Sequence, residues 1–280
     1  MSDTDGQDEE LNLTNKEKAQ ARKNLRSTSP VIFETIRQEG IEELERPLFS
    51  LWWSGVAAGV VMSLSLYSKG YLHHHLPDEA WRPIISNFGY CIGFVLVILG
   101  RLQLFTENTV KPVLPLLVTP TLWRLKTMMQ LWAVVLVANL VGIFFSVSLV
   151  DTAGLALPHQ IDAFLEVSHH LAERSALANI ALGVPAGFLL ASLVWALADS
   201  KDGRLLLIVA VTYIIAIGEF SHVVAGSAEV FLLALHGDMT YGAVFGQFIL
   251  PTLLGNILGG TGLFALIAYG QVRHEIQPDE

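Results

Sequence analysis

The sequence has few charges for its length. Only 15% of its 280 residues are charged and 52% are hydrophobic, whereas an ordinary soluble domain has about 25% charged residues. Many of the charges lie in residues 1–46, and long tracts after residue 48 have none. This composition excludes a typical soluble protein and predicts one that crosses a membrane several times. The net charge of −9 comes largely from the polar N-terminal segment.

Other features are missing as well. Cys91 is the only cysteine, which excludes a disulfide framework. Residues 1–28 lack the apolar core of a signal peptide, and we expect them to be a disordered cytoplasmic tail. The histidines at 73–75 and 169–170 lack metal-ligand spacing, so we expect solvated loop residues and no metal. Motifs for phosphate binding and nucleophilic catalysis are absent, so we expect neither an enzyme nor a cofactor nor a nucleic-acid partner.

Six apolar spans follow one another and predict an all-α membrane protein. They lie at about 48–67, 84–118, 122–150, 176–198, 204–235 and 244–269, each with enough apolar residues to cross a bilayer. Residues 29–46 mix apolar and charged side chains, which predicts an amphipathic helix at the membrane interface, with a solvated helix as the alternative. The channel domain is then 47–272, followed by a short C-terminal tail at 273–280.

The distribution of basic residues predicts the topology. Of the 17 Lys and Arg residues, the predicted outer loops hold only Lys69, Arg82 and Arg174. Cytoplasmic loops carry the excess of basic residues in membrane proteins. We therefore expect both termini to be cytoplasmic.

Polar residues interrupt the second span at 100–109 and the fifth span at 218–222. Backbone that leaves the helix within a membrane is tolerated only beside protein or a water-filled cavity, and two interrupted helices in corresponding positions point to a permeation site. Thr106 and His222 stand where the helices resume, where free N–H groups and the helix dipole favour an anion. The alternatives are a hydrogen-bonded core histidine and a threonine that satisfies carbonyls in a kink.

The two halves of the chain resemble each other. Gly55 and Gly59 match Gly183 and Gly187, Phe105 and Thr106 match Phe220 and Ser221, and Asn139 to Gly142 match Asn256 to Gly259. Because each half has three spans, the order predicts an inverted 3+3 repeat. Asn139, Asn256, Gly255 and Gly259 are then expected to serve helix packing, since small residues allow helices to approach closely.

Arg101, Glu107, Glu219 and Glu229 form an unusual set of charges within the two broken spans. A bare charge at the membrane centre costs several kcal/mol. We therefore expect a network of mutual neutralisation in which Arg101 pairs with Glu219. The alternative is that Arg101 attracts the substrate directly.

Together, Leu104-Phe105-Thr106, the segment from Gly218 through His222 to Gly226, and the segment from Gly255 to Gly260 resemble the formate/nitrite transporter family. The resemblance covers about residues 29–272. It implies an aquaporin-like protomer with helices 2 and 5 broken, assembled as a homopentamer in a bacterial inner membrane. Each protomer would have its own pore for small monovalent anions or weak acids such as formate, nitrite, hydrosulfide, acetate or lactate.

The resemblance also assigns roles to residues. Thr106 corresponds to the threonine of the loop in the second helix, His222 to the central pore histidine, and Phe105 to the loop phenylalanine at a hydrophobic constriction. Tyr90 and Phe94 are expected to line the outer vestibule and its constriction, and Ile215 is a candidate for the other constriction. Such apolar rings favour a neutral acid, or an anion joined by a proton.

The sequence departs from the family pattern at several polar positions. Ser221 stands where typical members carry Glu, with the acid displaced to Glu219, and Gly226 and Gly187 stand where they carry Asn. A counterpart of the family's lysine before the fourth span is missing, and Arg101 is an added charge. The closest resemblance is therefore to a divergent inner-membrane subgroup.

Three functions remain open from the sequence. The first is a channel or transporter for a small monovalent anion or its conjugate acid, with protons as a possible co-substrate. The second is an aquaporin-type channel for water or neutral solutes, although neither break contains Asn-Pro-Ala. The third is a membrane partner protein whose pore has decayed.

Overall fold

A computed structural model describes residue 14 and residues 27–200 and 202–276 of the chain. Every regular element in this part is a helix, which confirms the predicted all-α fold class. Most of the tail expected at 1–28 lies outside the described residues. Five helices are long and apolar enough to cross a membrane: Leu48–His75, Arg82–Leu99, Leu122–Thr152, Ala176–Asp199 and Tyr241–Ile276.

The first half of the chain ends with a long continuous helix. Its elements are α2 (Ser29–Glu45), α3 (Leu48–Met62), α4 (Leu64–His75), α5 (Arg82–Ser86), α6 (Cys91–Leu99), η1 (Glu107–Thr109), α7 (Val113–Val118) and α8 (Leu122–Thr152). Only Ser63 separates α3 from α4, so the first span continues well past residue 67. The expectation that 73–75 are loop residues was wrong, because these histidines form the last turn of α4.

The second half begins with a short helix that the sequence analysis did not predict. The elements are α9 (Pro158–Ser168), η2 (His169–Leu171), α10 (Ala176–Asp199), α11 (Arg204–Ile217), α12 (Val223–His236), α13 (Tyr241–Ala243), η3 (Val244–Ile249), α14 (Leu250–Ile257), η4 (Leu258–Ala265) and α15 (Leu266–Ile276). α9 packs on α4 through Phe164, which is fully buried and whose ring centroid lies 5.3 Å from that of Tyr67. The segment expected as a broken fifth span is two shorter apolar helices, α11 and α12.

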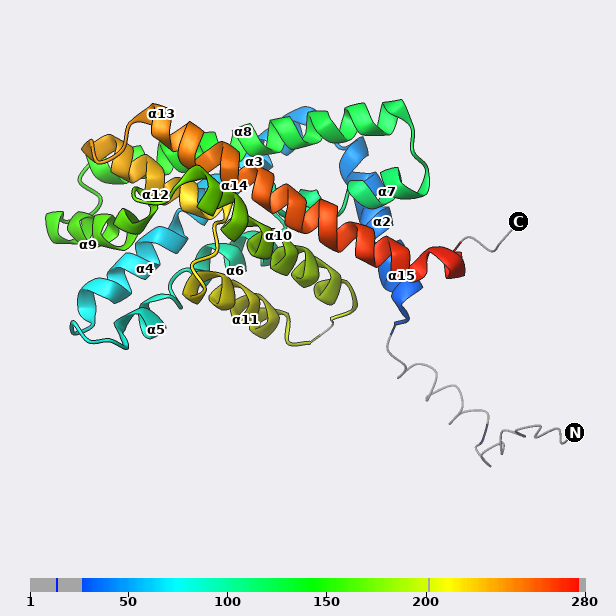
Figure 1. Cartoon of the computed structure of the whole chain (residues 1–280), viewed down its shortest axis with the longest axis horizontal. Helices are drawn as coiled ribbons and strands as arrows, with labels where there is room; N and C mark the ends of the chain where they lie inside the picture. Colours follow the sequence, from blue (N-terminus) through cyan, green and yellow to red (C-terminus); the bar gives the residue numbers. More distant parts are fainter. Residues whose placement is uncertain (1–13, 15–26, 201, 277–280) are drawn as a thin grey trace, which may run out of the picture.

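The first and last helices lie at the same end of the molecule. Figure 1 shows α2 and α15 together at one end and α9 and α13 at the other. The amide of Gln271 donates a hydrogen bond to the Ser29 hydroxyl at 2.9 Å. The apolar side of α2 packs on the protein, since Phe33 and Ile36 are fully buried. Gly40 allows the close approach, because a Cβ there would overlap the carbonyl oxygen of Lys111.

Glycines bring matching helices of the two halves into close contact. In the first half α3 packs on α8, and a Cβ on Gly59 would overlap the carbonyl oxygen of Asn139. In the second half α10 packs on α14, and a Cβ on Gly187 would overlap the carbonyl oxygen of Asn256. The same close approach through small residues therefore occurs in both halves, as helix packing within a membrane favours.

Candidate pore site

Two helices end in the same unusual turn. α6 ends at Leu99 and α11 ends at Ile217, and each is followed by a glycine and then by a residue with positive φ. These residues are Arg101, with φ 54°, and Glu219, with φ 51°. Side chains other than glycine seldom adopt this conformation, and it persists where the surrounding structure enforces it, often at functional sites. The two polar interruptions are therefore built on one backbone pattern.

Asn139 holds the first break in place. Its side-chain oxygen accepts the backbone N–H of Phe105 at 3.0 Å, and its Nδ2 donates to the carbonyls of Gln103 at 2.8 Å and Gly55 at 2.9 Å. The asparagine is fully buried. Buried backbone N–H and C=O groups that have no partner within a helix need other hydrogen-bond partners. Asn139 supplies them for the interrupted helix.

Asn256 does the same at the second break. Its oxygen accepts the backbone N–H of Val223 at 2.9 Å, and its Nδ2 donates to the carbonyls of Ser221 and Gly183, each at 2.9 Å. It is also fully buried. The two asparagines therefore do more than the helix packing that the sequence indicated, because each clamps a break to the neighbouring helix.

The clamps correct the alignment of the two breaks. Phe105 and Val223 donate to the equivalent asparagine oxygens, and Gln103 and Ser221 accept from the equivalent amides. The sequence match of Phe105 with Phe220 was therefore wrong by three positions. That alignment was based on the similarity of Phe105-Thr106 to Phe220-Ser221. The backbone hydrogen bonds to the two asparagines show that Phe105 is equivalent to Val223.

The structure joins the two breaks through Thr106 and His222. Thr106 Oγ1 and His222 Nε2 lie 2.8 Å apart, and both side chains are buried. His222 is also the N-cap of α12, where its Nδ1 accepts the backbone N–H of Ala225 at 3.0 Å. An imidazole nitrogen that accepts a hydrogen bond carries no proton, so the proton is on Nε2 and is donated to Thr106. This geometry fixes His222 as the neutral tautomer.

Aromatic and aliphatic side chains surround the histidine on one side. The Phe94 ring meets the His222 ring edge-on at 5.0 Å, and Tyr90 lies 5.3 Å from Phe94. Tyr90 and Ile215 are buried and line a cavity that reaches His222. Phe105 points elsewhere in the fold, with its ring 5.9 Å from Trp132. Of the predicted pore residues, Phe94 therefore packs on the histidine, and Tyr90 and Ile215 share its cavity.

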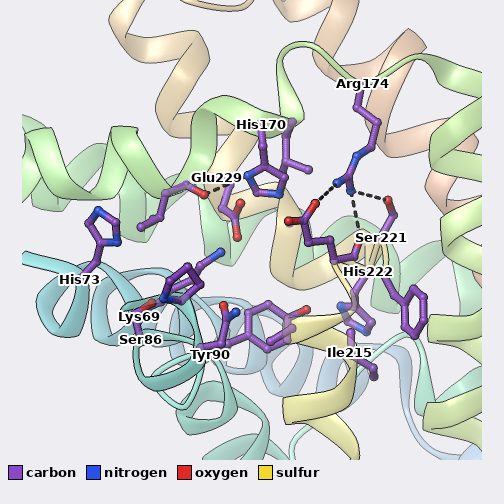
Figure 2. A pocket seen from close by; sticks show the side chains of 18 of the residues that line it. Lys69, His73, Ser86, Tyr90, His170, Arg174, Ile215, Ser221, His222 and Glu229 are labelled. Atoms are coloured by element: carbon purple, nitrogen blue, oxygen red, sulfur yellow. Dashed lines mark hydrogen bonds and ion pairs between the residues drawn. The ribbon is translucent and has the colours of Figure 1, made fainter. Parts of the chain in front are cut away.

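A cavity of about 210 Å³ opens from His222 toward the end that carries α4 and η2, and we call it the outer cavity after the predicted topology. Figure 2 shows His170 and Arg174 on one wall, with Lys69 and Tyr90 opposite. A second cavity, of about 590 Å³, lies at the α2 end and includes Leu104 and Glu107. We call it the inner cavity. His222 lines the outer cavity, and Leu104 and Glu107, which lie close to Thr106 in the chain, line the inner cavity, so the Thr106–His222 pair lies between the two.

The intramembrane charges are not paired as predicted. Glu219 forms an ion pair with Arg174 at 3.0 Å, at the outer cavity. Arg101 lines the inner cavity, and within the described residues it has no ion-pair partner. In an inverted repeat, equivalent positions face opposite sides of the membrane, so Arg101 and Glu219 are separated by the symmetry that relates them.

Glu107 and Glu229 have different surroundings. Glu107 and Glu39 both contact the ammonium of Lys111 at 3.2 Å, which ties α2 to the inner cavity. Glu229 lies in α12, lines the outer cavity and is 4% exposed. The expected network of four charges is therefore replaced by separate groups at the two cavities.

The sequence analysis missed two polar residues at the second break. Arg174 precedes α10 and donates to the Glu219 carbonyl at 3.0 Å and to the Ser221 hydroxyl at 3.4 Å (Figure 2). Ser221 in turn donates to the side-chain oxygen of Asn179, a fully buried residue of α10. Arg174 therefore supplies a cation at the outer cavity, where the sequence suggested that positive charge was lost. Asn179, a polar residue in the apolar fourth span, was the feature of the sequence that could have indicated this contact.

The histidine runs form no metal site. Within the described residues there is no group of three or more His, Cys, Asp or Glu side chains that could hold a metal ion. His73 Nε2 instead contacts Glu166 at 3.0 Å, and the His74 ring stacks on His159.

Comparison with known proteins gives the same fold and a family. Residues 30–270 match the family model described as formate/nitrite transporter. The chain is 34% identical over 278 residues to "Inner membrane protein YfdC" of Escherichia coli strain K12, covering 97% of this chain and 90% of that protein.

Two solved structures are similar. An "FNT family ion channel" has a TM-score of 0.75 at 20% identity, covering 86% of this chain and 99% of that chain. A "Pentameric formate channel with formate bound" has a TM-score of 0.69 at 17% identity, covering 81% and 97%.

Proposed function

Because the chain belongs to the formate/nitrite transporter family, we propose that it conducts a small monovalent anion together with a proton, or the equivalent neutral acid, across a bacterial inner membrane. Membership in this family makes it a multi-pass membrane transport protein and not an enzyme. The proposed substrates are formate, nitrite, hydrosulfide, acetate and lactate. The proposed assembly is a homopentamer, as in the similar formate channel, with both termini cytoplasmic.

The hydrogen bond between Thr106 and His222 carries the proposal. It lies in the barrier between the outer and inner cavities, at 2.8 Å. Neutral His222 donates through Nε2, and the Thr106 hydroxyl keeps its own proton to donate to a passing oxygen. Hydrogen-bond donors without a full charge favour an anion or acid while allowing it to leave again.

The apolar surroundings of the histidine support passage of a neutral species. Phe94 packs on the His222 ring, and Ile215 is fully buried beside the same cavity. A charge is costly in such a site unless it is paired. An anion that has gained a proton avoids this cost. Lys69 and Arg174 line the outer cavity and would attract the anion before it is neutralised.

Uptake into proteoliposomes tests the proposal. Formate, nitrite, acetate and lactate are added outside, and internal acidification is followed with a trapped pH indicator. We expect wild-type flux well above that of empty liposomes and a loss of up to about tenfold in His222→Phe, because the lost hydrogen bond joins neutral groups and contributes about 0.5–1.5 kcal/mol.

His236→Gln is the matched control, since His236 ends the same helix α12 and contacts Asp151 at 2.8 Å, far from Thr106 in the chain. Unchanged flux of all four substrates in folded wild-type protein would contradict the proposal. Osmotic shrinkage accelerated without any added anion would instead favour a channel for water or neutral solutes.

The N-terminal segments have a proposed place in this arrangement. We propose that α2 lies at the cytoplasmic interface of the channel domain 47–272, because its apolar face packs on the protein and its acidic face borders the inner cavity. Residues 1–28 and 273–280 would then extend into the cytoplasm. Flux that survives deletion of residues 1–28 would agree with a pore function that does not need the tail.

A further inference from the structure

Glu229 is a buried acid of the outer cavity without a partner for one of its oxygens. It lies in α12, two turns beyond His222, and is 4% exposed. Its Oε2 is buried and receives no hydrogen bond. Figure 2 shows the carboxyl group of Glu229 inside the cavity, beneath His170. A buried carboxyl oxygen without a donor is costly, so this atom is a place for a proton or for a ligand that brings one.

The charged groups around Glu229 are already engaged or neutral, with one exception. Arg174 is paired with Glu219. Burial lowers the pKa of His170, an effect that Glu229 opposes and Lys69 reinforces, so this histidine is uncharged at neutral pH. Lys69 is half-buried, lines the cavity and makes no ion pair in the part of the chain that the structure describes.

The other titratable groups that line the same cavity are His73, Tyr90 and His222. His73 lies on α4 and contacts Glu166, and Tyr90 precedes α6. His222 lies at the start of α12 and is held neutral by its two hydrogen bonds. η3 contributes only the ring of Phe248, and α9 contributes Val167. Lys69 is therefore the one unpaired cation facing Glu229 among the described residues.

A second unpartnered acceptor lies in the same cavity. Asn87 Oδ1 is buried and accepts no hydrogen bond. The oxygens of Glu229 and Asn87 would repel a bare anion in this cavity. The ammonium of Lys69 would repel a cation. Together these groups fit an anion that shares a proton with Glu229, with Lys69 balancing the remaining negative charge.

We propose that Glu229 is the proton donor of the outer cavity, which protonates the anion of a weak acid before it passes Phe94 and His222. The O–H bond at Glu229 Oε2 breaks, a new O–H (for hydrosulfide, S–H) bond forms on the substrate, and the carboxylate remains beside Lys69. The neutral acid continues inward, and Glu229 takes back a proton from outside water through the cavity. One anion and one proton cross together, so no net charge moves.

The proposal rests on the proposed function and narrows its substrate class. Conjugate bases of weak acids can accept the proton and pass. Anions of strong acids, such as nitrate or chloride, cannot accept it and are excluded, although they are similar in size to formate and nitrite. In this chain the acid lies on α12, seven residues beyond the histidine, and Ser221 stands immediately before the histidine.

Glu229→Gln tests the donor by its pH profile. Glutamine keeps the shape and hydrogen bonding but carries no exchangeable acid proton. We expect formate flux at neutral pH to fall about 10²-fold, the lower range of what a positioned proton transfer contributes, and to approach wild-type flux as the outer solution becomes acidic and supplies formic acid directly. Glu229→Asp should restore part of the neutral-pH flux.

Glu79→Gln is the matched control, because Glu79 lies between α4 and α5 at the same end of the molecule, is exposed and does not line the cavity. Its pH profile should follow wild type. A Glu229→Gln profile that runs parallel to wild type at every pH, or wild-type conduction of nitrate as fast as nitrite, would overturn the proposal.

An infrared measurement separates this inference from the proposed function. Formate added to wild-type protein in detergent should remove the carbonyl band of one protonated carboxylic acid, and Glu229→Gln should lack this change. Wild-type protein that carries no acid in liposomes but loses the Glu229 carbonyl band when formate is added would defeat the proposed function alone. Wild-type protein that carries formate but shows no change in a band assigned to Glu229 would defeat the donor alone.

Discussion

Replacing Asn139 by leucine removes the clamp on the first break while nearly preserving side-chain volume. The change deletes three hydrogen bonds. The Gly55 carbonyl lies within α3 and keeps its helical partner, but the N–H of Phe105 and the carbonyl of Gln103 lose theirs in a buried site. Each orphaned group costs about 1–3 kcal/mol, so we expect a loss of about 2–6 kcal/mol in the free energy of unfolding.

The melting temperature of the detergent-solubilised protein measures this loss. At about 2–4 °C per kcal/mol for a domain of this size, Asn139→Leu should melt at least about 4 °C below wild type. Formate flux per folded protein should also fall, because the Phe105–Thr106 segment that holds the hydrogen bond to His222 is no longer fixed.

Gln130→Leu is the matched control for this experiment. Gln130 lies on the same helix α8 and is exposed, so its replacement makes the same chemical change without affecting the break. If Asn139→Leu melts together with Gln130→Leu and conducts normally, the clamp is not what holds the break, and the reasoning from backbone satisfaction is refuted.

Three further results are expected. Thr106→Val should reduce formate flux while the protein still folds, because the Nε2–H of His222 loses its acceptor; normal flux per folded protein would contradict this. Gly187→Ala should lower the melting temperature through overlap with a carbonyl, an overpacking effect of about 1–3 kcal/mol, whereas Gly270→Ala, where a Cβ meets nothing within 4 Å, should not. Burial lowers the pKa of His170 in the folded protein, so below the ordinary histidine pKa of ~6.5 the unfolded state binds more protons than the folded state. The melting temperature should therefore fall as the pH drops through that value. His170→Gln should make the fall smaller.

The local sequence pattern was sufficient to predict the long apolar helices and the positions of the two breaks. Long apolar runs identify spans because lipid offers no hydrogen bonds to the backbone, and the polar interruptions at 100–109 and 218–222 coincide with the ends of α6 and α11. The same reasoning placed Thr106 and His222 at the points where the helices resume, and in the structure Thr106 Oγ1 and His222 Nε2 lie 2.8 Å apart.

The sequence did not predict which side chains distant in the chain pair with each other. The partner of Glu219 is Arg174, 45 residues away in the chain, and the expected Arg101 lies at the other cavity. The short α9 was missed because it has only 11 residues, too few to cross a membrane, and its apolar side is buried against α4 and α12, which the sequence does not place beside it. In both cases the sequence shows which groups need partners but not which groups the fold brings within reach.

The sequence by itself determined that this is an all-helical membrane protein with two interrupted helices, because hydropathy and backbone satisfaction act locally along the chain. The family followed from the resemblance of its short motifs, and the family model confirms it. The tertiary structure decided the register of the two breaks, since that depends on which carbonyls and N–H groups Asn139 and Asn256 reach. It also decided that Glu229 faces the outer cavity with an unpartnered oxygen. A charge in a span is visible in the sequence, but whether it is paired depends on contacts between helices.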